Sequence, residues 1–336
     1  MSHPASVSSV AVIGAGIAGI SCALALRQSF PQVTVFEKSP LPGGRMVSQT
    51  LDNYQFDCGT QYFTVRSDAF RAQVEQWCEQ WLSDEWSAWL VDLQAGEALS
   101  REDDITRYIG RPQMHSAIED MAEICDVHYN CEIKKLKRRK SAPYWELFGS
   151  DRKSKGLFDA VIIAVPAPEA VPLLKPASAL AKTASGVNMT SCWSVMLAFA
   201  NSLQLGFDGA YVLGDELSWA VRNNSKIERD AMNGAETWVL HAAPEWSDNN
   251  RKLAEGKVVS ALCEFFQKAT GRDLPQPDFS AARWWPYART LNPLTAGCLF
   301  DPELGIGACG DWCYGSRLES AYLSGVTVAG RLLQHG

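Results

Sequence analysis

The strongest constraint on the fold of this chain lies in residues 12–45. An apolar run ends in the glycine-rich segment Gly14-Ala15-Gly16-Ile17-Ala18-Gly19, and a second apolar run at residues 33–36 ends in Glu37. A strand that enters a glycine-rich turn and a helix, followed by a strand that ends in an acid, is the pattern of a βαβ unit that binds a dinucleotide. We therefore predict strand, helix and strand over residues 8–38, with the helix at about 17–28.

Each part of this unit has a physical task. Gly14 permits the tight turn, Gly16 lets the backbone approach a pyrophosphate, and Gly19 lets the helix pack closely on the strand. The free N–H groups and partial positive charge at the helix N-terminus attract the diphosphate. Glu37 would bind ribose hydroxyls and repel a 2′-phosphate. The predicted contacts with the ADP moiety are Gly14, Gly16, Ile17, Ala18, Gly19, Glu37 and Lys38.

The glycine-rich motif alone is compatible with both NAD and FAD, and a second glycine pair favours FAD. Gly43-Gly44-Arg45 follows the acid, and in this place it resembles the FAD enzymes of the amine-oxidase and glutathione-reductase superfamily. The resemblance implies that Gly44 and Arg45 meet the pyrophosphate of FAD. The alternative is a turn that carries a solvated arginine.

A glycine–aspartate pair near the C-terminus is the second cofactor signature. Gly310-Asp311 precedes a helix predicted from about Leu318. In the same superfamily such a pair binds the ribityl chain and pyrophosphate, and the helix points its N-terminus at the pyrimidine end of the flavin, where reduced flavin carries negative charge. The resemblance implies further FAD contacts at Gly310, Asp311, Leu318, Glu319 and Ser320, and at Ile133 beside the adenine.

Composition excludes several other classes of protein. The chain has 336 residues, of which 46% are hydrophobic and 21% charged, and its net charge is −7. Such an acidic chain is not expected to bind nucleic acid, and no apolar run reaches the length of a membrane span. The ten cysteines lack the paired spacing of a metal site. Because the N-terminal residues contain no apolar signal segment, we expect a cytoplasmic protein with reduced thiols and no bound metal.

The order of predicted elements indicates two interleaved domains. Residues 159–165 are a continuous apolar run, typical of a buried parallel strand, whereas residues 190–290 read mainly as strands with one helix near 251–270. We predict an α/β fold, in which a Rossmann-type FAD-binding domain of the glutathione-reductase and amine-oxidase type carries an interleaved α+β substrate domain on an antiparallel sheet. The FAD-binding domain takes residues 1–65, 105–170 and 290–336, and the substrate domain takes 66–104 and 171–289. Within the first, we predict a helix at 112–124 and strands at 127–136, 144–148 and 304–308.

Five further segments resemble one family more closely. They are Gly59-Thr60-Gln61-Tyr62-Phe63-Thr64-Val65-Arg66, WAVRNNSKIER at 219–229, WVLHA at 238–242, RWWPYAR at 283–289, and CGDWC at 309–313 with Arg317-Leu318-Glu319 after it. In this order they are similar to segments of the bacterial renalases. The chain departs from that family at Thr60, where alanine is common, and at residues 290–298.

The resemblance implies a specific activity. Bacterial renalases share the fold of amine oxidases but oxidise isomeric dihydronicotinamide dinucleotides, namely 2-dihydro-NAD(P) and in some relatives the 6-dihydro isomer. Hydride passes to N5 of non-covalently bound FAD, NAD(P)+ is released, and oxygen reoxidises the flavin to give hydrogen peroxide. Such a transfer requires the donor carbon to be held over flavin N5 in a shaped pocket, and needs no acid, base or nucleophile from the protein. The expected partners are this small-molecule substrate and oxygen.

The substrate pocket is assigned by hypothesis. Gln61, Tyr62 and Thr64 border the isoalloxazine ring, and Gln61 and Tyr62 count among the FAD contacts. Trp246, Trp284 and Tyr287 form apolar walls, and His241 is either a carboxamide contact or a structural strand histidine. The expected hydrogen-bond donors for the substrate are Arg222, Asn223, Lys226 and Arg289. For Arg222 and Arg289 the alternative is a buried ion pair.

Two other functions remain open. A flavin-dependent amine oxidase would share the fold, but residues 271–300 contain no lysine for a position near flavin N5. A flavin-bound redox sensor without turnover is suggested by the ten cysteines, although no cysteine has an identifiable basic environment at a helix start. Reduction of the flavin by a substrate would distinguish an enzyme from a sensor.

Overall fold

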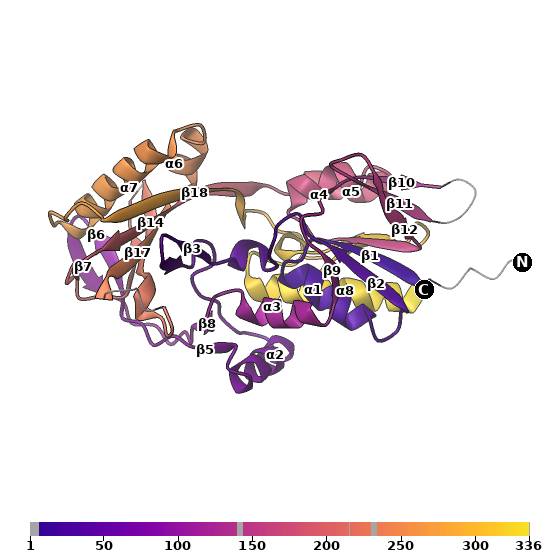
Figure 1. Ribbon diagram of the computed structural model, residues 1–336, viewed down its shortest axis with the longest axis horizontal. Coiled ribbons are helices and arrows are strands. Elements are labelled where there is room, and N and C mark those ends of the chain that lie inside the picture. Colours follow the sequence, from indigo (N-terminus) through magenta and orange to yellow (C-terminus); the bar gives the residue numbers. More distant parts are fainter. Residues whose placement is uncertain (1–6, 140–143, 215, 230–233, 336) are drawn as a thin grey trace, which may run out of the picture.

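The structure, a computed structural model, describes residues 7–139, 144–214, 216–229 and 234–335. Two main sheets lie beside each other, with a few short elements between them (Figure 1). Segments from the start, the middle and the end of the chain build one sheet, and most of residues 189–290 build the other.

The first sheet has six strands in the order β19-β20-β13-β1-β2-β9. Neighbours from β20 to β9 are parallel, and β19 pairs antiparallel with β20 at one edge. Strand β1 lies in the middle, where Val12 pairs with Val35 of β2 and with Ile162 of β13. The strands are β1 (Ser9–Ile13), β2 (Gln32–Phe36), β9 (Asp126–His128), β13 (Ala160–Ile163), β19 (Leu299–Asp301) and β20 (Ile306–Ala308).

Both faces of this sheet are covered. Val10 and Val12 point to a core shared with helices α1 (Ile17–Leu26), α3 (Ser116–Glu123) and α8 (Leu318–His335). Ala11 and Ile13 point to the opposite core, as the alternation of side chains along a strand requires. That second core is completed by the sheet of β10 (Ile133–Arg138), β11 (Trp145–Gly149) and β12 (Ser154–Phe158), and by helices α4 (Ala167–Leu173) and α5 (Ser178–Ser185). Burial on both faces explains why β1 and β13 are almost wholly apolar.

The second sheet has seven strands in the order β18-β14-β17-β16-β15-β6-β7. All neighbours are antiparallel except β15 and β6. Helix α7 (Glu255–Thr270) packs on one face through Val258, Leu262 and Phe266, and α6 (Pro244–Asn249) lies beside β14. The strands are β6 (Leu90–Gln94), β7 (Glu97–Ser100), β14 (Met189–Phe199), β15 (Gly209–Val212), β16 (Leu217–Arg222), β17 (Glu236–Ala242) and β18 (Phe279–Thr290).

Short elements connect the two sheets. Helix α2 (Asp68–Glu79) contacts α8 and β5, and two short strand pairs lie between the main sheets (Figure 1). These pairs are β3 (Gln49–Leu51) with β4 (Tyr54–Phe56), and β5 (Ser83–Glu85) with β8 (Tyr108–Gly110). Because β5 and β8 pair across residue 104, the predicted boundary between 66–104 and 105–170 runs through one structural unit. The two-domain division itself stays a proposal.

The α/β fold predicted from the sequence is confirmed, with two differences in detail. The strand predicted at 127–136 is split, because the chain turns at Asn130, whose φ is +53°, so that β9 joins the main sheet and β10 joins the three-stranded sheet. The helix predicted from 112 begins at Ser116. No helix in the described ranges is long and apolar enough to cross a bilayer.

Candidate cofactor and substrate site

A cavity of about 1340 Å³ lies between the two main sheets. One wall is formed where β1, β2, β13 and β20 end, together with the first residues of α1 and α8. The other wall comes from Cys192 of β14, His241 of β17 and residues 283–288 of β18. Ligands of open parallel sheets bind at the carboxyl ends of the strands. The cavity is larger than the roughly 300–1,000 Å³ common for small ligands.

The glycine-rich turn lies at one end of this cavity. Gly14 has a φ of +105°, in the left-handed region that glycine accommodates. A Cβ added to Gly16 would meet no atom within 4 Å, so the backbone there is open to the cavity. A Cβ on Gly19 would lie 1.9 Å from the carbonyl oxygen of Gly14, so Gly19 serves close packing of helix on strand. No side chain caps the N-terminus of α1, which leaves its first amides available to an anion.

Glu37 is held in place beside this turn. Its Oε2 accepts a hydrogen bond from Ala15 N at 2.8 Å, and its Oε1 accepts one from Ser39 N at 2.7 Å. The side chain is buried but lines the cavity, and a carboxylate bound by two amides keeps lone pairs for further donors. Glu37 is therefore fixed where ribose hydroxyls could donate to it.

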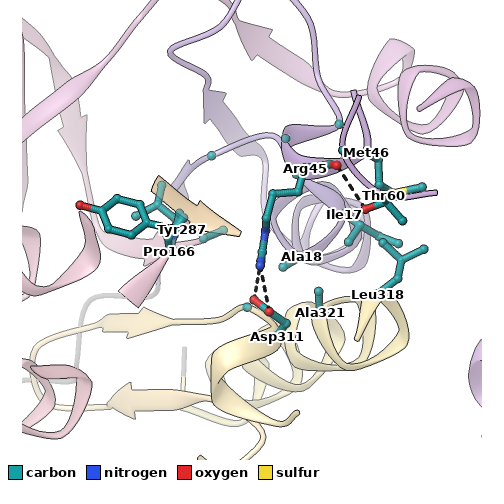
Figure 2. A pocket seen from close by; sticks show the side chains of 18 of the residues that line it. Ile17, Ala18, Arg45, Met46, Thr60, Pro166, Tyr287, Asp311, Leu318 and Ala321 are labelled. Atoms are coloured by element: carbon teal, nitrogen blue, oxygen red, sulfur yellow. Dashed lines mark hydrogen bonds and ion pairs between the residues drawn. The ribbon is translucent and has the colours of Figure 1, made fainter. Parts of the chain in front are cut away.

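Arg45 and Asp311 meet across the floor of the cavity (Figure 2). Arg45 Nη1 donates to Asp311 Oδ2 at 3.0 Å, and Nη2 donates to Oδ1 at 2.5 Å. Asp311 follows Gly310, whose φ is +150°, and it also accepts a hydrogen bond from Thr290 Oγ1 at 3.1 Å. The planar guanidinium keeps N–H groups for a second acceptor, so the pair can anchor a diphosphate while remaining neutral overall.

The residues at this end of the cavity fit FAD. An open glycine turn, uncapped helix amides and Arg45 suit a diphosphate, and Glu37 suits a ribose. Lys38, paired with Glu169 at 2.8 Å, and Ile133 line the portion beyond Glu37 where an adenine would lie. The segment before Gln61 packs closely against the segment that carries Arg45. A Cβ on Gly59 would lie only 2.1 Å from the carbonyl oxygen of Arg45.

At α8, only part of the expected contact set reaches the cavity. Leu318 lines it, with Ser316, Arg317 and Ala321 nearby. The Glu319 side chain turns away, because its Oε1 accepts from Ser67 N and Ser67 Oγ at 2.6 and 2.5 Å. Ser320 does not line the cavity either. Gly44, by contrast, lines it with a φ of +57°.

Several residues expected in the substrate pocket do line the cavity. They are Tyr62 and Thr64, which follow β4, and His241, Trp284 and Tyr287 of the second sheet. Tyr62 is packed by Trp86 and Trp219, with ring centroids 6.0 and 5.9 Å away. The inner end of the cavity is thus lined largely by partly buried aromatic rings.

Six other expected pocket residues do not line the cavity: Gln61, Arg222, Asn223, Lys226, Trp246 and Arg289. Arg222 instead pairs with Asp208 and borders a separate hollow of about 290 Å³. Trp246 packs edge-on against Phe265 at 5.6 Å between ring centroids.

Gln61, Asn223 and Lys226 belong to a buried polar network behind the cavity wall. Its centre is Asp57, which sequence reasoning did not identify. Lys226 Nζ donates to Asp57 Oδ2 at 3.0 Å and to Gln61 Oε1 at 2.9 Å. Arg229 also pairs with Asp57, at 3.2 Å. Burial alone would raise the pKa of Asp57, but the two cations lower it well below its usual value. The only local signal in the sequence was an acid between Phe56 and Cys58.

His241 connects this network to the cavity. Its Nε2 lies 3.4 Å from Gln61 Nε2. Burial, followed by the charge of Lys226, lowers the pKa of His241 to about 4. The imidazole is therefore uncharged near neutral pH, so it can form hydrogen bonds with a ligand without placing a charge in the pocket.

Positive charge predominates in the rest of the cavity lining. Arg66, Arg71, Arg283 and Arg317 line it, and none has an ion-pair partner among the residues that the structure describes. Arg283 stacks over the ring of Trp285 at 4.1 Å. The unpaired acids in the lining are Glu37, held by amides at the dinucleotide end, and Asp104. The lining of the cavity, most of all at its exposed arginines, is thus more positive than a chain of net charge −7 would suggest.

Comparison with family profiles gives two matches. Residues 12–79 match a NAD(P)-binding Rossmann-like domain, and residues 73–333 match flavin containing amine oxidoreductase. The second match covers most of the chain.

Curated relatives match over shorter stretches. A 1-hydroxycarotenoid 3,4-desaturase from Flavobacterium sp. is 44% identical over 54 residues, which is 16% of this chain and 11% of that protein. Coproporphyrinogen III oxidase from Staphylococcus aureus is 45% identical over 60 residues, 17% of this chain and 13% of that protein. A bifunctional protein of tRNA 5-methylaminomethyl-2-thiouridine biosynthesis from Magnetococcus marinus is 28% identical over 221 residues, 53% of this chain. The chain spans only 11% to 32% of the length of these relatives.

Solved structures match over nearly the whole chain. A putative protoporphyrinogen oxidase from Exiguobacterium sp. has a TM-score of 0.77 at 13% identity, with 98% of this chain and 100% of that chain covered. Putrescine oxidase bound to putrescine has a TM-score of 0.71 at 14% identity, with 97% and 99% covered. At such identity these likenesses show the fold.

Proposed function

This chain belongs to the family of flavin containing amine oxidoreductases, and within that family we propose that it is an FAD-dependent oxidase of isomeric dihydronicotinamide dinucleotides. FAD is its cofactor. In this proposal a hydride leaves 2-dihydro-NAD(P), or the 6-dihydro isomer, so that NAD(P)+ is formed and oxygen is reduced to hydrogen peroxide.

The observation that carries the proposal is the charge of the cavity. Four lining arginines lack acid partners among the described residues, and outside the dinucleotide end Asp104 is the acid they face. A substrate amine is a cation near neutral pH and would be repelled, whereas a dinucleotide carries negative phosphates. The buried Lys226 is also unavailable to a substrate, because Asp57 and Gln61 hold its ammonium group behind the wall.

The residues at the inner end of the cavity suit a hydride donor that the protein must orient but need not activate with an acid, a base or a nucleophile. Bound FAD supplies the two-electron acceptor and the reaction with oxygen. Tyr62, Trp284 and Tyr287 provide flat walls for a nicotinamide ring and exclude water. The uncharged His241 is placed to form a hydrogen bond with a carboxamide. Holding the donor carbon in place in this way supplies most of what such a transfer requires.

The cysteines support non-covalent binding of FAD. Cys309 and Cys313 are fully buried and do not line the cavity. Cys192 does line it, but burial raises the pKa of its thiol to about 12. A protonated thiol is a poor nucleophile, so no lining thiol beside the aromatic end is activated to bond to a flavin.

The test is anaerobic mixing of the yellow holoenzyme with 2-dihydro-NAD while the oxidised-flavin absorbance is followed. We expect rapid loss of that absorbance, and its recovery with formation of hydrogen peroxide when air is admitted. Ordinary 4-dihydro-NAD serves as the matched control and should reduce the flavin far more slowly.

A panel of amines separates the competing functions. Reduction by an amine such as putrescine, with none by 2-dihydro-NAD or the 6-dihydro isomer, would replace this proposal by amine oxidation. No reduction by any of these compounds would favour a flavoprotein that senses rather than turns over.

A further inference from the structure

We propose that Arg66, Arg71 and Arg317 form a subsite at the mouth of the cavity that binds the phosphate groups of the dinucleotide substrate. This inference rests on the proposed function and adds to it where the phosphates lie and which residues select for them. It orients the substrate with its nicotinamide at the aromatic inner end and its phosphates at the junction of α2 and α8.

The three arginines come together because two helices begin at the same place. Arg66 precedes Ser67, the N-cap of α2, and Arg71 lies one turn into that helix. Arg317 precedes Leu318, the first residue of α8. Ser67 is bonded through both its N–H and its hydroxyl to Glu319, so the start of one helix is fixed to the start of the other.

Further contacts make this junction rigid. The Tyr322 hydroxyl lies 3.2 Å from Gln73 Oε1, and the ring centroids of Phe70 and Tyr322 are 5.3 Å apart. Glu319 is buried, accepts hydrogen bonds from Ser67, and forms no ion pair with Arg66 or Arg317. The backbone that carries the three arginines is thus fixed, and none of their guanidinium groups forms an ion pair with a described acid.

The cofactor does not account for these arginines. The residues that fit the FAD diphosphate are Arg45, Asp311 and the turn at Gly14–Gly19, which lie where β1 and β20 end. Arg66, Arg71 and Arg317 line the same cavity but are exposed, and they lie at the starts of α2 and α8 rather than at the ends of these strands. Three unpaired guanidinium groups at the mouth of a cavity suit the charge and bidentate geometry of phosphate.

The experiment compares substrates that differ in their phosphates. Arg66→Ala, Arg71→Ala and Arg317→Ala holoenzymes are mixed anaerobically with 2-dihydro-NAD, with the corresponding mononucleotide and with the phosphate-free riboside. We expect each variant to weaken binding of 2-dihydro-NAD by about 3- to 10-fold, as expected for loss of a solvent-exposed charge-assisted hydrogen bond. The limiting rate of flavin reduction should stay constant, and the riboside should bind equally to variant and wild type.

Control variants define the specificity of the effect. Arg251→Ala removes an exposed arginine outside the cavity lining and should change nothing. Arg317→Lys keeps the charge without the planar fork and should restore part of the affinity. A larger loss for 2-dihydro-NADP than for 2-dihydro-NAD would assign the subsite to the 2′-phosphate, and a loss shared with the mononucleotide would assign it to the diphosphate.

Three outcomes would overturn the subsite: equal weakening of the riboside, no weakening of any substrate, or loss of FAD from the variants. If the wild type is not reduced by any dihydronicotinamide, the proposed function fails instead. In that case ADP binding to the FAD-loaded proteins still tests the subsite, because binding needs no hydride transfer. Equal ADP affinity in wild type and all three variants would then reject it.

Discussion

Asp57 is the residue on which the buried charge of this molecule depends. Its side chain and that of Lys226 are 0% exposed, and Arg229 pairs with the same carboxylate. Ser48 Oγ donates to Asp57 Oδ1 at 2.6 Å, and Asp57 N donates to the Asn223 side chain at 3.1 Å. One carboxylate therefore compensates two cations that burial would otherwise destabilise.

The substitution Asp57→Asn tests this role at the residue scale. Asparagine keeps the size of the side chain but leaves two buried cations without a counter-ion, so the free energy of unfolding should fall by about 3–5 kcal/mol. Urea unfolding of the holoenzyme gives the measurement. Asp120→Asn, an exposed acid on α3, should change the same quantity by no more than about 0.5 kcal/mol. Equal midpoints for the two variants would show that the network does not stabilise the fold.

The sequence could predict the residues of the cofactor site better than those of the substrate site. The positions of Gly14, Gly19 and Glu37 follow from local spacing, because each acts within one βαβ unit. Arg222 was expected either at the substrate or in a buried ion pair, and it forms an ion pair with Asp208, which immediately precedes strand β15. The face on which a strand-end arginine lies depends on such long-range pairing, which spacing alone does not reveal.

At the scale of elements, the packing of α8 on α1 places the cofactor amides. A Cβ on Gly325 of α8 would lie 2.1 Å from the carbonyl oxygen of Ala18 and 2.3 Å from Ser21 Oγ. Helices α1 and α8 therefore lie closer together than they could if residue 325 carried a side chain. The first turn of α1, whose amides would face the diphosphate of FAD, is held from behind by this contact.

Gly325→Ala should therefore weaken both stability and FAD binding. Overpacking of this kind costs about 1–3 kcal/mol of the free energy of unfolding, and any shift of α1 moves the amides of Ile17 and Ala18. The matched control is Gly330→Ala in the same helix, where an added Cβ meets no atom within 4 Å. That change should stabilise the helix by about 0.5–1 kcal/mol. FAD titration of the apoprotein and thermal unfolding measure the two effects, and identical results for both variants would contradict the packing argument.

Helices with a strong local sequence pattern could be predicted. Strands whose bounds depend on the strands they pair with could not. The helix from Ile17 and the helix from Leu318 begin where the sequence predicts. The apolar and basic stretch at 127–136 looked like one strand, yet Asn130 turns the chain so that its halves join different sheets. The composition of each half is compatible with a strand. The split is therefore decided by the neighbouring strands with which each half pairs.

At the scale of the whole molecule, each of the two main sheets has one core cluster of its own, and the cavity lies between the sheets. Gly14 and Glu37 line it from the first sheet, and Cys192, His241 and Trp284 line it from the second. One further core cluster includes residues of both, such as Val12 of β1 and Val239 of β17. A ligand that fills the cavity therefore contacts both halves of the fold.

Removal of FAD should thus destabilise both sheets rather than the dinucleotide-binding half alone. A ligand that binds only the folded state at about a hundredfold excess over its Kd adds about 2.7 kcal/mol to the free energy of unfolding. Hydrogen exchange on holoprotein and apoprotein locates that loss, and we expect faster exchange in β14 and β18 as well as in β1 and β2, with slow exchange restored by added FAD. The reason is that Cys192 and Trp284 lose a filled neighbour when the cavity empties, just as Gly14 and Glu37 do. If faster exchange were confined to β1 and β2, FAD would be bound by the first sheet alone, and the cavity beside β18 would hold substrate without the cofactor reaching it.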